Sequence, residues 1–374
     1  MLHVERFATF EELAPLRARW DQLAGDRPFC GWTWQMNWWR HYGGQVGARR
    51  QLCVLCGFDG RGELRAIAPL YVDRSAARGT ALRLLGDGEA CSDYLTFLCE
   101  PATAPEAAAV LAGYVAEELP RHCVWDLIDL VGPAADDPTI ALFAEELADR
   151  RCSVHRREGP NCWAIPLPSK MDDYRARLPA KRRKRLDRLA EEYLSGGRAV
   201  MRLCERFDQM EHALELLIAM HQRRRRSLGE PGCYSSPTFE AFVRGTTPAM
   251  FAEGKVQLAY LEIDGRPAAV DYLLLTPDAA CAYQGAVEPD MLEHEPGKLL
   301  HWALVRWAIR EGYRSYDFLR GDEPYKAHLG AEPRPMTLWR IAAPHLSAQL
   351  RHRLWLAARN VKHLFAGREP APVG

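Results

Sequence analysis

The chain has 374 residues, enough for two domains of ordinary size. Apolar residues make up 48% and charged residues 26%, which is ordinary globular usage and excludes a disordered, collagen-like or small disulfide-rich chain. Lys and Arg total 49, as do Asp and Glu, so no global charge indicates a nucleic-acid coat protein. Residues 1–150 carry 14 Arg, no Lys and 22 acidic groups, a net charge of −8, and the remainder carries 35 basic and 27 acidic groups, a net of +8. We therefore expect negatively charged partners at the second half.

Eleven scattered cysteines, an odd number, favour free buried thiols in a reducing compartment. The N-terminal segment lacks the apolar stretch of a signal peptide, and no apolar run approaches the roughly 18 residues of a membrane-spanning helix. The only CxxC pair, Cys53 and Cys56, has no second pair or histidines nearby to complete a zinc site. These features predict a cytoplasmic protein without a bound metal.

In the first half, helical patterns at about 11–23 and 32–42 precede two strand-like runs, QLCVLCGF and LRAIAPLYV, on either side of a DGRG turn. The segment LRLLGDGEACSDYLTFL then predicts two short strands around a polar loop. A helix at about 105–119 and the strand VWDLIDLVG complete this half.

The second half begins near Trp163. A basic helix, a strand and two helices are expected at about 180–194, 199–205, 208–227 and 237–252. Three strands follow, with the sequences VQLAYLEI, AAVDYLLL and ACAYQGAV. A helix from Pro296 to Gly312, the strand SYDFL and the polar turn RGDEPYK come next, and the chain closes with the strand MTLWRIA and a basic amphipathic helix.

The order of elements in the first half recurs in the second. Asp-Gly turns at Asp59 and Asp264 lie 205 residues apart, and aromatic-Asp steps at Trp125-Asp126 and Tyr316-Asp317 lie 191 apart. Each half therefore has a β-hairpin, further strands, a helix and a strand. The repeat predicts two related, mixed α/β domains.

Four features of the second half can carry chemistry, and each also has a purely structural explanation. Pro296-Gly297-Lys298 opens a helix whose N-terminus can bind an anion or can simply be capped. His221 lies on the apolar stripe of its helix before four arginines, where a core histidine is the alternative. The helix at 181–188 carries six basic side chains, which can contact RNA or an anionic headgroup or can be solvated. The fourth feature is a group of charged side chains around an apolar strand, which can form a functional site or a structural ion-pair network. Its six members are Arg314, Asp317, Arg320, Asp322, Glu323 and Lys326.

In this order, these features resemble the CelD-like acetyltransferases of the GNAT superfamily, a group associated with cellulose and exopolysaccharide biosynthesis and related to the tandem-GNAT FemABX transferases. The resemblance spans roughly residues 5–345. It is carried by WWRH at 38–41, LRLLGDGEACSDYLTFL, the basic helix, HQRR at 221–224, LEIDGRPAAVDYLLL, PGKLL at 296–300 and, above all, YDFLRGDEPYKAHLG. The chain departs from the family after Lys326, where AHLG replaces a tryptophan-bearing step.

The resemblance implies two tandem GNAT-like domains with mixed central sheets flanked by helices. Residues 1–162 are expected to form a degenerate N-terminal domain and residues 163–345 the acyltransferase domain, and residues 346–374 a basic amphipathic helix and tail. Acetyl-CoA is the implied donor of the acyl group, and no metal is implied. Its pantetheine arm is expected to enter a gap between AAVDYLLL and ACAYQGAV, and its diphosphate to lie at Gly297, Lys298 and Leu299.

The resemblance also implies roles for particular side chains. His221, Asp317 and Asp322 are the candidate catalytic groups. The expected substrate-binding cations are Arg320 and Lys326, together with Arg182 and Arg185 of the basic helix.

The function expected from the resemblance is acyl transfer to an amine or hydroxyl of an envelope or exopolysaccharide-linked acceptor, with peripheral attachment to a biosynthetic complex and no DNA partner. One alternative is a FemABX-like aminoacyltransferase that takes its acyl group from charged tRNA. The basic helix favours this alternative and the neutral overall charge disfavours it. A second alternative is a non-catalytic scaffold for polysaccharide biosynthesis that retains the fold.

Overall fold

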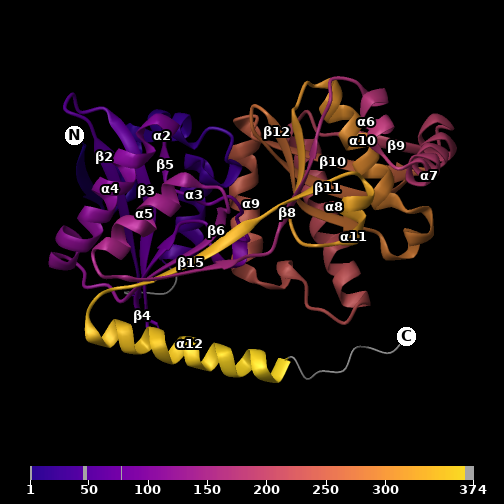
Figure 1. Ribbon diagram of the computed structural model, residues 1–374. Coiled ribbons are helices and arrows are strands. Elements are labelled where there is room, and N and C mark those ends of the chain that lie inside the picture. The colour runs from indigo at the N-terminus through magenta and orange to yellow at the C-terminus, as the bar shows by residue number, and fades with distance from the viewer. Residues whose placement is uncertain (1, 45–48, 77, 367–374) are drawn as a thin grey trace.

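The computed structural model describes residues 2–44, 49–76 and 78–366, with backbone alone from residue 358 on (Figure 1). Within these residues the strands form two mixed sheets, one in each lobe of the molecule. The strands of the first sheet are β1 (His3–Phe7), β2 (Arg50–Phe58), β3 (Leu64–Ser75), β4 (Gly79–Leu84), β5 (Leu98–Cys99), β6 (Leu127–Ala134), β7 (Ser153–Glu158) and β15 (Met336–Ala342). Those of the second are β8 (Cys162–Pro166), β9 (Ala199–Leu203), β10 (Val256–Ile263), β11 (Arg266–Leu275), β12 (Ala279–Val287), β13 (Ser315–Arg320) and β14 (Glu332–Arg334).

Helices flank both sheets. The first lobe contains α1 (Phe10–Leu13), α2 (Arg17–Ala24), α3 (Trp32–Trp38), α4 (Ala104–Gly113) and α5 (Pro138–Asp149). The second contains α6 (Met171–Arg177), α7 (Ala180–Ala190), α8 (Phe207–Ser227), α9 (Pro237–Ala252), α10 (Pro296–Arg310) and α11 (Pro324–His328), and α12 (Leu346–Ala366) ends the described chain. Local chemistry sets several starts: the Asp137 carboxylate accepts from the N–H groups of Thr139 and Ile140 at the start of α5, and Ser236 caps α9 ahead of Pro237.

The two sheets have related strand orders, β1-β2-β3-β4-β6-β15-β7 and, read in reverse, β9-β10-β11-β12-β13-β8-β14, with β5 paired to β3 beside the first. The sixth strand is exchanged between the sheets, because β15 follows β14 in the chain and β8 follows β7. In each sheet one parallel pair, β4 with β6 or β12 with β13, follows a run of antiparallel strands. A helix connection precedes β6 and β13 in the same way. The expectation of two related, mixed α/β domains is confirmed.

The C-terminal part of the chain returns to the first lobe. Strand β15 pairs antiparallel with β6 and with β7, so it completes the first sheet although it lies within residues 163–345. The expected domain boundaries therefore do not follow the sheets. No local pattern in MTLWRIA distinguishes a strand of one sheet from a strand of the other, because both sheets bury apolar faces.

The lobes share a continuous apolar core. Trp34 of α3 packs edge-on against Phe242 of α9 and Tyr283 of β12, with ring centroids 4.9 and 5.2 Å apart. The Tyr283 hydroxyl donates to the Ala90 carbonyl at 2.9 Å. The indole-rich segment at 32–42 therefore serves core packing between the lobes, as its helical spacing indicates.

Candidate functional site

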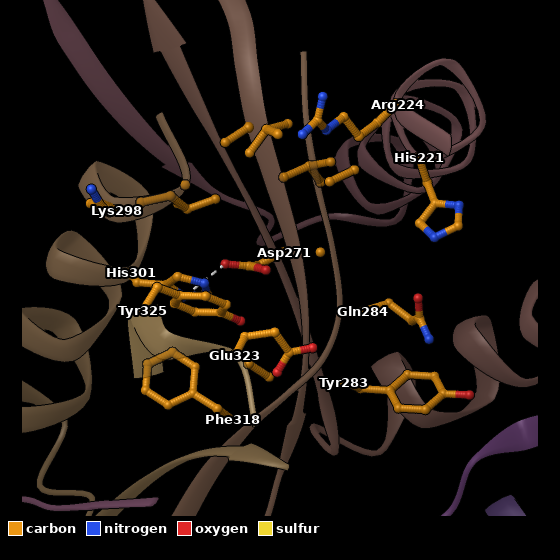
Figure 2. A pocket seen from close by; sticks show the side chains of 18 of the residues that line it. His221, Arg224, Asp271, Tyr283, Gln284, Lys298, His301, Phe318, Glu323 and Tyr325 are labelled. Atoms are coloured by element: carbon orange, nitrogen blue, oxygen red, sulfur yellow. Dashed lines mark ion pairs between the residues drawn. The ribbon is translucent and has the colours of Figure 1, made fainter. Parts of the chain in front are cut away.

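A cavity of about 830 Å³ opens in the second lobe where β12 and β13 separate (Figure 2). These strands are parallel, and their register pairs only 279–281 with 315–317. By contrast, β11 and β12 remain paired from Ala269–Val287 to Leu275–Ala280. The expected gap between AAVDYLLL and ACAYQGAV is therefore wrong, and the gap lies one strand further along the sheet. A short turn holds β11 and β12 in register, whereas β12 and β13 are joined through α10 and are free to diverge.

The N-terminus of α10 borders this cavity. Gly297 and Lys298 line it, whereas Leu299 is 1% exposed and packs in the core of the second lobe. A Cβ at position 297 would lie 3.2 Å from a methyl carbon of Val287, so glycine permits the close approach of α10 to β12. The N–H groups of Lys298 and Leu299 already donate to the Glu295 carbonyl, at 3.0 and 3.2 Å.

Glu295 places a carboxylate at this helix start. Its oxygens pair with the Lys298 ammonium and, at 2.7 Å, with the Arg185 guanidinium. Burial raises the pKa of Glu295, but the hydrogen bonds from Lys298 and Arg185 outweigh it and lower the pKa overall. An anion bound here would have to share these cations with Glu295.

A buried acid and a buried histidine face each other inside the cavity. Asp271 of β11 is 4% exposed and lies 3.2 Å from Nδ1 of His301 on α10, which also contacts the Tyr316 hydroxyl at 3.1 Å (Figure 2). Tyr325 stacks on the imidazole with ring planes 7° apart. Burial raises the pKa of Asp271 and, together with the charge of Lys326, lowers that of His301. The two groups therefore favour holding one proton between them.

Neither residue of this pair was among the sequence candidates. The signal for Asp271 is a lone carboxylate inside the apolar run AAVDYLLL, which must find a partner if that strand is buried. His301 gives a weaker signal, because LLHWALVRW reads as an ordinary core helix. Asp271 and His301 meet because α10 packs against β11, and no local sequence pattern predicts that packing.

His221 of α8 also lines the cavity, on the side of Asp271 opposite His301 (Figure 2). It is 6% exposed, packs edge-on against Tyr234 and lies 3.6 Å through Nε2 from the Cys233 sulfur. Burial lowers the pKa of His221, so its neutral form is favoured. A neutral imidazole at a cavity wall can accept a proton.

Asp317 and Arg320 join the two lobes. Asp317 is 2% exposed, accepts from the Tyr94 hydroxyl at 2.7 Å and does not line the cavity. Arg320 reaches the cavity wall, but its guanidinium pairs with the buried Asp93, and its backbone N–H donates to the same carboxylate at 3.0 Å. These contacts account for both side chains as lobe-joining groups, and their proposed roles in catalysis and substrate binding stay predictions.

Asp322 and Lys326 stabilise the turn after β13. Asp322 accepts from the indole N–H of Trp163 at 2.9 Å and does not line the cavity. The Lys326 side chain is 3% exposed and donates to the carbonyls of Leu319, Arg320 and Gly321 at 3.2, 2.7 and 3.0 Å. Lys326 lines the cavity, but with its ammonium engaged in this way it is poorly placed to bind a charged acceptor.

A smaller cavity of about 270 Å³ lies beside the main one, between α7 and α10. Arg182 and Arg185 line it, and both cavities share Glu295, Lys298 and Tyr325. Both arginines are exposed, and Arg182 donates to the Ala327 carbonyl at 3.0 Å. The structure thus brings the expected cations of the basic helix to the edge of the main cavity.

Within the described ranges, no group of three His, Cys, Asp or Glu side chains has the geometry to hold a metal ion. All eleven cysteines lie in these ranges as free thiols. None of the described helices is long and apolar enough to cross a bilayer.

Comparison with known proteins gives a family match within the second lobe. Residues 180–327 match the acetyltransferase (GNAT) domain family. No curated protein matches the chain. Similar solved structures are FemX (TM-score 0.66, 11% identity, covering 93% of this chain and 99% of that one) and a protein of unknown function from Bacteroides thetaiotaomicron (TM-score 0.58, 10% identity, covering 91% and 100%). A third is the C-terminal domain of a putative lysylphosphatidylglycerol synthetase from Agrobacterium fabrum (TM-score 0.55, 10% identity, covering 92% and 96%).

The second lobe therefore contains a segment that matches the GNAT domain family, and the chain shares its fold with these structures. At such identities the structural likeness concerns the fold alone. The narrower resemblance to CelD-like acetyltransferases stays a prediction.

Proposed function

We propose that this protein is an acyltransferase that moves an acyl group, acetyl by default, from acyl-CoA to an amine or hydroxyl bound in the main cavity. The observation that carries the proposal is the separation of the parallel strands β12 and β13 next to the N-terminus of α10. Strand separation leaves backbone groups of β12 unpaired on one side, where an extended pantetheine arm can hydrogen-bond.

The donor's phosphates have basic partners at one end of the cavity. The α10 N-terminus contributes its dipole and the close approach allowed by Gly297. Arg224 extends into the cavity from α8 (Figure 2), and Lys298 lies at the helix start. We propose that phosphate binding draws Lys298 away from Glu295.

The chemistry requires the acceptor nitrogen or oxygen to bond to the thioester carbon while the carbon–sulfur bond breaks, with the acceptor's proton ending on the CoA thiol. Neutral His221 is suited to take that proton. The Asp271–His301 pair is suited to give its proton to the leaving thiolate, and the proton held by His221 then returns to the pair through solvent, so the net change moves one proton from the acceptor to the CoA thiol. Asp317 and Asp322 remain catalytic candidates on sequence grounds alone.

The acceptor proposed here is an envelope or exopolysaccharide-linked amine or hydroxyl. This choice rests on the sequence resemblance, and the cavity supports it only by its size and mixed polarity.

Two observations favour a second candidate, aminoacyl transfer from charged tRNA. Glu295 places negative charge at the α10 N-terminus, where a CoA diphosphate should lie. The exposed basic face of α7 at the neighbouring cavity also suits an RNA backbone.

Thermal denaturation of the purified protein separates the candidates. Acetyl-CoA and CoA should each raise the melting temperature, because a ligand that binds only folded protein stabilises it. Uncharged and charged tRNA should have no such effect. Stabilisation by charged tRNA alone would support aminoacyl transfer, and stabilisation by none of these ligands would support a non-catalytic scaffold.

A further inference from the structure

The terminal helix α12 exposes an apolar stripe. Leu346, Leu350 and Leu354 are 89%, 60% and 62% exposed and follow one another at intervals of four residues, which places them on one face. The opposite face packs on the first lobe, where Ala348 and His352 are buried. Single exposed leucines are ordinary, but three in a row on a helix that already has a buried face form a surface patch.

The helix is also basic. Over its 21 residues it contains no Asp or Glu, and Arg351 and Arg353 are exposed beside the leucines. It is not apolar enough to span a bilayer. A helix with an apolar stripe bordered by arginines is suited to lie in the plane of a membrane interface.

Next to this helix, four arginines surround a cavity of about 290 Å³: Arg78, Arg157, Arg340 and Arg351. Carboxylates lie near two of them, Asp129 at 3.6 Å from Arg78 and Asp126 at 2.6 Å from Arg351. The Nε of Arg340 is buried without a hydrogen-bond partner.

The aromatic wall of this cavity holds its cations in place. The Arg340 guanidinium lies 4.3 Å from the ring centroid of Trp355, and that of Arg157 lies 5.8 Å from the same ring. Burial lowers the pKa of Arg340, and the charges of Arg78 and Arg157 lower it further. Clustered cations with an unsatisfied N–H favour a bound anion such as a phosphate.

We propose that this face of the protein binds an anionic lipid bilayer, with the α12 leucines among the headgroups and acyl chain ends and one lipid phosphate in the arginine cavity. A membrane accounts for both features, because its acyl chains can contact the leucines and its lipid phosphates can bind the arginines. The inference goes beyond acyl transfer and does not depend on it.

The second lobe has a smaller feature of the same kind. In Figure 1, α12 runs along the lower side of the molecule and the connection from α8 to α9 projects toward that side. Leu228 in this connection is 51% exposed, lies two residues after the last of four consecutive arginines and lines the main cavity. A membrane on this side would bring a lipid-linked acceptor to the cavity rim.

Vesicle co-sedimentation of the full-length protein tests the proposal. Wild type should bind vesicles of phosphatidylcholine mixed with phosphatidylglycerol and should bind pure phosphatidylcholine much more weakly. The variant Leu346→Ser, Leu350→Ser, Leu354→Ser should lose at least tenfold in affinity, and Arg157→Gln with Arg353→Gln should reduce binding toward the level seen with phosphatidylcholine alone. As a matched control, Val200→Ser with Phe207→Ser changes exposed apolar residues of β9 and α8 in the second lobe and should bind as wild type does.

Circular dichroism and melting temperature verify that each variant is folded, which we expect because the changed side chains are exposed. Absence of wild-type binding to the anionic vesicles, or equal binding by the leucine variant, would overturn the proposal. Light scattering that shows a wild-type dimer dissociated by the leucine changes, without vesicle binding, would assign the stripe to a second copy. Stabilisation by inorganic phosphate without vesicle binding would assign the cavity to a free anion and equally overturn it.

Discussion

Asp271 occupies the centre of the main cavity because residue 285 on the neighbouring strand is glycine. A Cβ at position 285 would overlap the Asp271 carboxylate, whereas Gly285 lets it lie against the backbone of β12 and reach His301. Glycine in a strand interior carries an entropic cost and marks such a close approach. Gly285 therefore permits the contact between Asp271 and His301, the two groups that hold a proton inside the cavity.

We predict that Gly285→Ala destabilises the protein by about 1–3 kcal/mol, since the Asp271 side chain must move and break its contact with His301. Urea denaturation measures the change. Gly60→Ala is the matched control, because nothing lies within 4 Å of a Cβ at that position, and it should stay within about 0.5 kcal/mol of wild type. If Gly285→Ala and Gly60→Ala proved equally stable, glycine at position 285 would not be needed for the contact between Asp271 and His301.

The second residue-scale prediction concerns pH. Burial lowers the pKa of His221 below its ordinary value of about 6.5. As pH falls through about 6.5, the unfolded chain binds a proton that the folded chain still refuses, so stability decreases from there down to the folded pKa. His221→Gln removes this contribution.

Melting temperatures at about pH 8 and pH 5.5 provide the measurement, and the variant should lose less stability than wild type over this interval. His3→Gln, which removes an exposed histidine, is the matched control for the loss of one imidazole. Identical pH dependence in wild type and the His221 variant would mean that this imidazole titrates as freely as in the unfolded chain.

Sequence reasoning found only part of the site, and the residues show why. His221 and Gly297 lie on helices whose periodicity and caps are local signals, and both line the cavity. Asp317 and Asp322 stand in the most distinctive stretch of the chain, but their partners, Tyr94 and Trp163, lie more than 150 residues away in sequence. A charge cluster therefore indicates importance without distinguishing a catalytic from a lobe-joining role.

At the scale of elements, α7 is a basic helix whose two sides differ. Arg182 and Arg185 face the small cavity beside the main one, whereas Lys184 and Arg188 are exposed and do not line it. The residue Leu186, on the side toward α10, is buried. The helix is thus held by apolar contacts, and Arg182 and Arg185 stay exposed at the cavity edge although they also contact the Ala327 carbonyl and Glu295.

We predict that Arg182→Glu with Arg185→Glu weakens acetyl-CoA binding at least tenfold, because two negative charges then stand beside Glu295 and Lys298 near the α10 N-terminus. Calorimetric titration gives the affinity. The control Lys184→Glu with Arg188→Glu has the same net charge and should bind nearly as wild type does. Equal losses in both variants would indicate a general electrostatic effect and would remove α7 from the site.

Sequence periodicity predicted most of the helices and strands, but it did not predict which strands pair. The range 237–252 coincides with α9, and the three expected strands before α10 are β10, β11 and β12. Which pair of strands separates depends on α10 crossing between β12 and β13, a tertiary feature. Short elements such as α6 and β14 were not predicted, because they have too few residues to show a hydrophobic period.

For the whole molecule, the two lobes act as one body because the chain crosses between them repeatedly. Strand β15 returns from the second lobe to the first sheet, and the buried carboxylates of Asp317 and Asp93 contact Tyr94 and Arg320 of the opposite lobe. The internal repeat predicts two domains, but a repeat carries no information on their docking. The first lobe positions the end of β13, and with it one wall of the main cavity.

The central claim is that the cavity between β12 and β13 binds acyl-CoA, with the diphosphate at the start of α10. Calorimetric titration of acetyl-CoA into wild type and Gly297→Asp tests it most directly, because the substitution puts a negative charge at the proposed phosphate position and helix starts tolerate Asp. The change also requires a small adjustment at Val287, so thermal denaturation of the ligand-free variant serves as the folding control. We predict measurable binding by wild type and a loss of at least tenfold, about 1.4 kcal/mol, in the variant. Equal affinity in both proteins would exclude this helix as the phosphate site, and absence of binding by wild type would contradict the assignment of acyl-CoA as the donor.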